Sequence, residues 1–205
     1  MNMAHGRVSE GDDDEFDAKM QRDPGLFACA PTRATRTFGF DWASGFVSPF
    51  LSSSRKDAEA VVRRVQLSER DHVVDLGSGD GTLLLHVARA TGASGTGVEL
   101  DEGLVHEARK KQLEMAVSRV QFTCQDLFDF DVDKATVILL FLLPQALIKL
   151  AGKMKRFLRD TQRCSATVVT NKWPLPDCKE YLHEEICKGE VHLYIYCHKQ
   201  KPNKK

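Results

Sequence analysis

The sequence predicts an α/β fold in which a mostly parallel sheet is covered by helices on both faces. Three observations support this. Short apolar runs rich in β-branched residues, typical of buried strands, alternate with longer stretches whose apolar residues have helical spacing. The run from Val73 to Gly81 passes from such a strand through a glycine-rich turn into a helix. Near the C-terminus, apolar and polar residues alternate over 191–198 after Lys188-Gly189, which predicts an antiparallel hairpin.

The predicted elements follow one another in a regular order. A first helix over 55–65 is preceded by three serines at 52–54 that can cap its amino end. The chain continues with strand 72–76, helix 82–90, strand 95–100, helix 102–117, strand 120–124, strand 135–141, helix 144–158 and strand 164–171. Segments 181–187 and 191–198 complete the pattern as a hairpin whose second strand enters the sheet antiparallel.

The two ends of the chain differ in composition from its middle. Residues 1–30 form an acidic stretch with few side chains that can pack, and 199–205 form a basic tail; both are expected to be solvated and disordered. Between them, 31–198 are expected to form one domain. Its first part, about 38–66, begins with five aromatic residues in thirteen positions. These aromatics are expected to form either a lid over a binding site or a plug over one end of the sheet.

Charge and cysteine content exclude several classes of protein. Lys plus Arg and Asp plus Glu both total 29, so the balanced charge argues against bulk nucleic-acid binding. The six cysteines form no C-x-x-C pair and no zinc spacing, so we expect no metal site. No secretory signal is visible, and the longest apolar run, 137–143, is too short to span a membrane. These features predict an intracellular, cytoplasmic protein with reduced thiols.

The glycine turn after the first strand is the strongest indication of a binding site. Gly77 and Gly79 allow the backbone to approach a ligand closely, and the next helix presents free N–H groups at its start. Dinucleotide-binding turns have the spacing G-x-G-x-x-G/A, but the third small residue is replaced here by Thr82. Instead, an acid, Asp75, precedes the pattern G-x-G-x-G.

Two further acids follow the next two strands. Glu99 ends the second strand, where a carboxylate can accept hydrogen bonds from both hydroxyls of a ribose. Asp126 follows the third strand and could accept a hydrogen bond from an adenine amino group. In this order, the set resembles the class I S-adenosylmethionine-dependent methyltransferases. That resemblance implies a Rossmann-like, mostly parallel seven-stranded sheet with a C-terminal antiparallel hairpin, and S-adenosyl-L-methionine as the cofactor.

The residues that leave the fourth strand bear on the methyl acceptor. The run 138–145 contains no Asn/Asp-Pro-Pro-Tyr, the arrangement used on adenine or glutamine amides, and no Pro-Cys nucleophile for cytosine. Its aromatic and apolar residues suit a lysine side chain, whose stem favours apolar walls and whose head can face a ring. Alternatively, Phe141 and Leu142 belong simply to the core.

Several strings together resemble the family of protein-lysine methyltransferases that modify the mitochondrial adenine nucleotide translocase and the ATP synthase c subunit, with bacterial relatives. The resemblance covers about 46–173. The strings are Phe46-Val-Ser-Pro49, Val74-Asp-Leu-Gly-Ser-Gly-Asp-Gly81, Gly97-Val-Glu-Leu-Asp101, Gln125-Asp-Leu-Phe128, Ala135-Thr-Val-Ile-Leu-Leu-Phe-Leu-Leu-Pro144 and Asn171-Lys-Trp173-Pro. Two features depart from the family: Phe141 stands where relatives often carry Tyr, and no apolar membrane-targeting segment precedes the domain.

The resemblance implies a role for each matching residue. Expected cofactor contacts are Asp75, Gly77 and Gly79 at the methionine part, Glu99 at the ribose, and Asp126 and Leu127 at the adenine. Ser78 and Leu100 are also expected to contact the cofactor. Expected contacts on the substrate side are Phe46, Ser48, Pro49 and Trp173, with Phe141 as a wall of the methyl-transfer site.

The implied activity is protein-lysine N-methylation of a protein partner, without a metal and with no nucleic-acid substrate expected. The alternatives are methylation of a small metabolite amine and a non-catalytic, cofactor-binding regulatory module. The resemblance also offers a mitochondrial location as the alternative to the cytoplasm.

Overall fold

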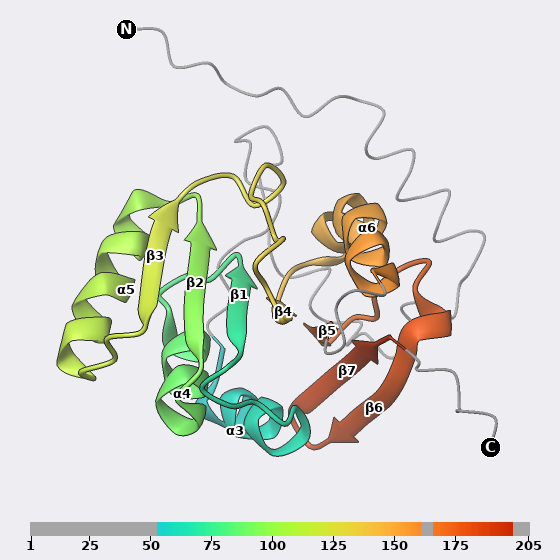
Figure 1. Cartoon of the computed structure of the whole chain (residues 1–205), viewed down its shortest axis with the longest axis horizontal. Coiled ribbons are helices and arrows are strands. Elements are labelled where there is room, and N and C mark those ends of the chain that lie inside the picture. The colour runs from blue at the N-terminus through green and yellow to red at the C-terminus, as the bar shows by residue number, and fades with distance from the viewer. Residues whose placement is uncertain (1–52, 161–165, 199–205) are drawn as a thin grey trace, which may run out of the picture.

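The computed structural model describes residues 53–160 and 166–198, which form a seven-stranded sheet flanked by helices (Figure 1). The strand order is β3-β2-β1-β4-β5-β7-β6, and the first five strands are parallel. Strand β7 joins β5 antiparallel and pairs with β6 in a hairpin. The predicted mostly parallel sheet with a C-terminal antiparallel hairpin is therefore confirmed.

The element bounds agree closely with those expected from the sequence. The strands are β1 (His72–Leu76), β2 (Ser94–Glu99), β3 (Val120–Cys124), β4 (Val137–Leu140), β5 (Thr167–Asn171), β6 (Leu182–Lys188) and β7 (Val191–Cys197). The helices are α3 (Arg55–Arg64), α4 (Thr82–Thr91), α5 (Glu102–Glu114), α6 (Pro144–Arg159) and the short 3-10 helix η2 (Lys179–Tyr181).

Local capping explains where several helices begin and end. Ser54 caps α3 and forms a reciprocal capping box with Asp57, which confirms one of the caps predicted in the serine run. Gly92 ends α4 in the left-handed conformation. Helix α5 is shorter than the predicted 102–117, because Ala116 adopts a positive φ of 53° and the helical path cannot continue through it.

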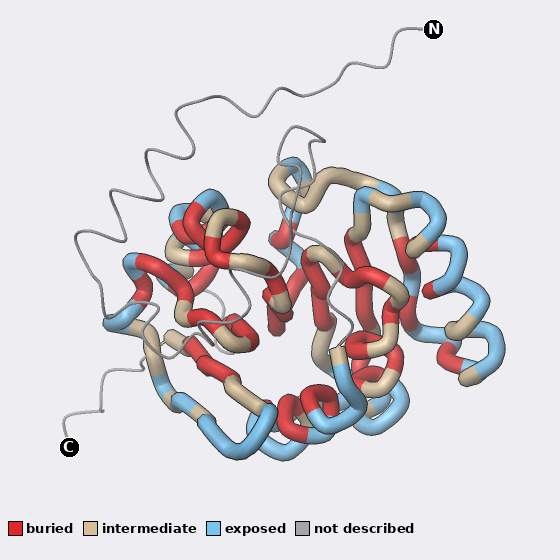
Figure 2. The backbone as a smooth tube through the Cα atoms, turned by 180° about the vertical axis from the view of Figure 1, so that it is seen from behind, coloured by how far each residue is buried: buried red, intermediate tan, exposed pale blue. Residues whose placement is uncertain are grey.

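Two apolar clusters cover the two faces of the sheet, as expected for parallel strands buried on both sides. Helices α3, α4 and α5 pack on one face, and α6 packs on the other. Figure 2 shows the buried residues along the strands and on the inward sides of these helices. Alternate residues of the central strands contribute to each cluster: Val73, Val137, Leu139 and Val169 face α3–α5, whereas Val74, Ile138, Leu140 and Val168 face α6.

Some predictions fall outside the described residues. The acidic leader 1–30, the aromatic residues at 38–50 and the basic tail 199–205 all lie there. Among the helices of the described ranges, none combines the length and the apolar composition needed to cross a bilayer.

Gly97 of β2 is predicted to be essential for close packing against the Phe122 ring of β3 and Ser78 of the glycine turn. A Cβ added there would overlap the Phe122 ring and lie 2.8 Å from Ser78 Oγ. Gly97→Ala is therefore expected to lower the free energy of unfolding by about 1–3 kcal/mol through overpacking. Gly152→Ala is the control, because Gly152 is exposed within α6 and its added Cβ meets only Arg156, 3.8 Å away.

Urea unfolding of both variants provides the measurement. The control substitution should leave stability unchanged or raise it by up to about 1 kcal/mol, since alanine is the better helix former. An unfolding midpoint of Gly97→Ala equal to that of the unsubstituted protein would show that the sheet accommodates the methyl group.

Candidate cofactor site

The chain leaves β1 through a turn that depends on glycine. Gly77 and Gly79 have φ values of 80° and 54°, which side-chain-bearing residues rarely adopt. The backbone N–H groups of Gly77 and Ser78 both donate to the carbonyl oxygen of Val98, at 2.8 and 3.0 Å. A Cβ on Gly77 would lie 2.6 Å from Leu142 Cδ2, so the turn is also closely packed. The predicted glycine turn is thus fixed against the carboxyl end of β2.

The Glu99 carboxylate ties this turn to the end of β2. Its Oε2 accepts a hydrogen bond from the Gly79 N–H at 2.9 Å, and its Oε1 accepts from Leu100 and Asp101 N–H at 2.8 and 3.0 Å. A carboxylate oxygen can accept about two hydrogen bonds, so Oε2 keeps one acceptor position. The sequence predicts that both ribose hydroxyls donate to this carboxylate. While the hydrogen bond from Gly79 is kept, Oε2 can accept only one of them.

Asp126 follows β3, as predicted, and also has an acceptor position open. Its Oδ1 accepts from the Phe128 N–H at 2.8 Å, while Oδ2 receives no hydrogen bond from the described residues. The loop is held by a residue that sequence reasoning missed: the Lys153 ammonium donates to the carbonyls of Phe128, at 2.9 Å, and Phe130. Burial lowers the pKa of Lys153, although the nearby loop carboxylates oppose this.

Asp75 lies at the end of β1 and is only 2% exposed. Burial, together with the nearby carboxylates of Glu99 and Asp80, raises its pKa to about 7. None of the described residues donates a hydrogen bond to its side chain. Asp80 differs: burial would raise its pKa, but hydrogen bonds from Lys111 and Thr82 hold it below its usual value. A buried carboxylate such as Asp75, which pairs with no cation among the described side chains, is suited to a positively charged ligand.

The other three predicted cofactor residues, Ser78, Leu100 and Leu127, differ in burial and in the surroundings of their side chains. The Ser78 hydroxyl is buried, has no hydrogen-bond partner within 53–160 and 166–198, and lies towards Gly97. Leu100 is 47% exposed just after β2. Leu127 packs against the α6-face cluster and lies close to Gly77. The backbone N–H of Ser78 donates a hydrogen bond to the carbonyl oxygen of Val98. A contact between Ser78 and a cofactor would therefore involve another atom of the residue.

The predicted substrate-side residues divide into three groups. Phe141 is half-buried just past the end of β4 and packs on the α3–α5 face. Trp173 is 3% exposed in the α6-face core, and its Nε1 has no hydrogen-bond partner in the part of the chain that the structure describes. Phe46, Ser48 and Pro49 lie outside the described residues. The structure thus gives Trp173 a packing role, and its contact with substrate stays a prediction.

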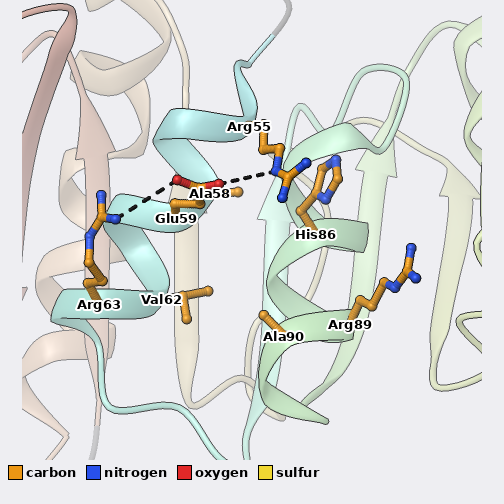
Figure 3. A pocket seen from close by; sticks show the side chains of 8 residues that line it. All are labelled: Arg55, Ala58, Glu59, Val62, Arg63, His86, Arg89 and Ala90. Atoms are coloured by element: carbon orange, nitrogen blue, oxygen red, sulfur yellow. Dashed lines mark hydrogen bonds and ion pairs between the residues drawn. The ribbon is translucent and has the colours of Figure 1, made fainter.

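A separate surface cavity of about 620 Å³ lies between α3 and α4 (Figure 3). Its lining consists of Arg55, Ala58, Glu59, Val62, Arg63, His86, Arg89 and Ala90. The α4 residues in this lining begin at His86, four residues after the first residue of the helix, whereas the glycine turn precedes that first residue. The cavity is therefore distinct from the site at the strand ends.

The fold and the site together define a class of protein. A glycine turn after β1 and carboxylates at or just past the carboxyl ends of β1, β2 and β3 lie at the edge of the sheet where α/β folds bind ligands. Glu99 and Asp126 can each accept a further hydrogen bond, and the buried Asp75 carboxylate favours a positive charge beside it. These properties fit a ligand in which a nucleoside is joined to a positively charged group. With the strand order 3-2-1-4-5-7-6, this is the class I methyltransferase fold.

Comparison with known proteins identifies the family within this class. Residues 75–181, just over half of the chain, match the family described as the ANTKMT methyltransferase domain. The chain belongs to this family, which confirms the resemblance found in the sequence.

Curated relatives include two lysine methyltransferases. The human lysine N-methyltransferase of the ATP synthase c subunit is 30% identical over 129 residues, which are 62% of this chain and 53% of that protein. A protein-lysine N-methyltransferase from Saccharolobus islandicus (strain REY15A) is 26% identical over 156 residues, 72% of this chain and 92% of that protein. The chain therefore spans about half the length of its human relative.

Solved structures agree on the fold. An RNA methyltransferase from Salinibacter ruber, in complex with S-adenosyl-L-homocysteine, superposes with a TM-score of 0.65 and 27% identity. The match covers 76% of this chain and 98% of that one.

Proposed function

We propose that this protein is an S-adenosylmethionine-dependent methyltransferase that modifies the side-chain amine of lysine in a protein. The observation that carries the lysine assignment is the end of β4, where the half-buried Phe141 is followed by Leu142, Leu143 and Pro144. An aromatic and apolar wall suits the aliphatic stem of lysine and desolvates its amine. The names of the human and Saccharolobus relatives support the same substrate class.

The site residues support this cofactor. Glu99 and Asp126 would hold the ribose and the adenine through their open acceptor positions, and Asp75 would face the cationic part. When bound, S-adenosylmethionine supplies an activated methyl group and leaves as a neutral thioether, so the protein need not protonate a leaving group. The chain must instead align the amine and exclude water.

The amine must reach the site without its proton. A free lysine has a pKa near 10.4, and an apolar wall lowers that value by desolvation. No ionisable side chain lies between Val137 and Gln145, so we expect the proton to pass to solvent. The rate should then rise with pH towards the pKa of the bound amine.

Methylation with labelled cofactor tests this proposal. The protein is incubated with methyl-labelled S-adenosylmethionine and a cell lysate, and labelled molecules are identified by mass spectrometry. The c subunit of ATP synthase, which the human relative's name gives as its substrate, is the first purified protein to try. Methyl-lysine is the expected product. Label on RNA, which the Salinibacter ruber neighbour's name gives as its substrate, or on a metabolite would reject the lysine assignment. Cofactor binding without any transfer would support a regulatory module instead.

Phe141→Ala should slow methyl transfer while leaving cofactor affinity nearly unchanged. The substitution removes the wall beside the proposed amine position but touches neither Glu99 nor Asp126. We expect a roughly 10- to 100-fold lower rate, the size of effect that misalignment of reacting groups can produce. Rates on lysate protein and calorimetric titration with S-adenosylhomocysteine provide the measurement. An unchanged rate would place Phe141 in the core alone.

A further inference from the structure

Asn171, the last residue of β5, carries a buried polar group that the fold does not use. The residue is only 8% exposed, and its side-chain Oδ1 has no hydrogen-bond partner among the described residues. Burying such an acceptor without a partner costs free energy, so unpaired groups are rare in folded proteins. Its neighbour Thr170 shows the usual arrangement, because the Thr170 hydroxyl donates to the carbonyl of Trp173 at 2.6 Å.

The strand register places Asn171 beside Phe141. Val169 pairs with Leu139 between β5 and β4, and Asn171 and Phe141 each lie two residues further along. Since side chains alternate across a strand, both lie on the α3–α5 face. Two contacts support this: Phe141 packs against the cluster of that face, and Leu193, the partner of Asn171 across β7, belongs to it.

The same face holds Asp75. Asp75 pairs with Leu139 between β1 and β4, so its side chain lies on the face that also carries Phe141 and Asn171. Trp173, which has the other unpaired polar group after β5, packs instead in the α6-face core. Of these two unpaired groups from the end of β5 onward, Asn171 is therefore the one that shares a face with Asp75 and the proposed wall of the methyl-transfer site.

We propose that Asn171 and Phe141 form the binding subsite for the substrate amine. This inference rests on the proposed lysine methyltransferase function. The Asn171 Oδ1 accepts a hydrogen bond from an N–H of the amine, while the Phe141 ring packs against the aliphatic stem. An amide oxygen suits this task, because it can orient an N–H but cannot take up the proton that the amine must lose. The nitrogen lone pair is then left free to attack.

Substitution of Asn171 separates this role from a structural one. Asn171→Leu removes both polar atoms at similar size, whereas Asn171→Asp keeps an acceptor at the same position. The control is Thr170→Val, which removes a hydroxyl that is paired in the same strand. For each variant, we would measure thermal unfolding, S-adenosylhomocysteine affinity by calorimetry, and methyl-lysine formed in lysate protein from labelled S-adenosylmethionine.

The expected results differ among the variants. Asn171→Leu should unfold at the same or a higher temperature than the unsubstituted protein, bind S-adenosylhomocysteine within twofold, and form methyl-lysine at least tenfold more slowly. Asn171→Asp should retain more activity than Asn171→Leu. Thr170→Val should unfold at a lower temperature, because loss of the Thr170 hydroxyl removes the hydrogen bond to the buried Trp173 carbonyl.

Three results would overturn the inference. The first is methyl-lysine formation at the normal rate by Asn171→Leu. The second is loss of the folded state in that variant, which would show a structural role for the amide. The third is equal loss of activity in the Leu and Asp variants, which would exclude the acceptor role. If the unsubstituted protein binds S-adenosylhomocysteine but forms no methyl-lysine, the proposed function itself is rejected, and the inference falls with it.

Discussion

Replacing Glu99 by alanine is expected to weaken S-adenosylmethionine binding by about 1.5–3 kcal/mol, the range for charge-assisted hydrogen bonds. This corresponds to a Kd higher by roughly 10- to 150-fold. The substitution has two effects that act in the same direction. It removes the acceptor proposed for the ribose, and it frees the N–H groups of Gly79, Leu100 and Asp101, which now hold the glycine turn against β2.

Calorimetric titration of Glu99→Ala with S-adenosylmethionine gives the measurement. Glu102→Ala is the matched control, because it removes an exposed carboxylate only three residues away, at the start of α5. The control should bind as tightly as the unsubstituted protein. Equal affinity in Glu99→Ala would remove Glu99 from the cofactor site, and equal losses in both variants would indicate a general effect of charge.

Local signals in the sequence were sufficient for most of the fold. Strand and helix periods, the serine cap before α3 and the glycine at the end of α4 are each encoded by a few adjacent residues. The hairpin was predictable because Val191 to Cys197 alternate apolar and polar side chains after Gly189, which has a φ of 62°. The exact end of α5 was not predictable, because alanine rarely adopts the left-handed conformation that Ala116 has here.

The candidate site was predictable only in part, because several of its properties arise between strands. The order of Asp75, Glu99 and Asp126 at strand ends is visible in the sequence. The bond between Glu99 and Gly79 is not, because it joins residues twenty positions apart. Lys153 has no motif around it, and its role depends on carbonyls more than twenty residues away.

The orientations of the Asn171 and Trp173 side chains also could not be predicted from the sequence. Both belong to a string that resembles a family motif, but the string does not say which side chain faces which layer. That assignment requires the pairing of β5 with β4 and β7. With the pairing known, Trp173 packs in the core and Asn171 is left with an unpaired oxygen on the Phe141 face.

Replacing Asp75 by asparagine is expected to stabilise the ligand-free protein above neutral pH and to abolish methyl transfer. Burial, with the Glu99 and Asp80 carboxylates, raises the pKa of Asp75 from its ordinary 3.8 to about 7 in the folded state. At 1.36 kcal/mol per pKa unit, this rise corresponds to about 4 kcal/mol. The folded state keeps the proton between these two pH values, whereas the unfolded chain loses it. The cost of ionising Asp75 is therefore absent below about pH 4 and complete above about pH 7.

Measuring the free energy of unfolding from pH 4 to pH 8 tests whether ionisation of Asp75 destabilises the fold. The stability difference between Asp75→Asn and the unsubstituted protein should be smallest at pH 4 and grow to about 4 kcal/mol at pH 8. Asp80→Asn should behave oppositely, because the Lys111 ammonium and Thr82 lower the pKa of Asp80 and its carboxylate stabilises the fold. That variant should lose stability at pH 8, and the loss should persist down to pH 4, because the pKa of Asp80 lies below its ordinary 3.8.

Cofactor binding by Asp75→Asn completes the argument. The asparagine has no charge to offer a cationic ligand, so its affinity for S-adenosylmethionine should fall even though its fold is more stable. The unsubstituted protein should bind this cofactor more tightly at pH 8 than at pH 6, since binding favours the ionised carboxylate and releases a proton. A variant that is less stable at pH 8 would show that Asp75 supports the fold. A variant that is more stable yet binds and transfers normally would remove Asp75 from the cofactor site.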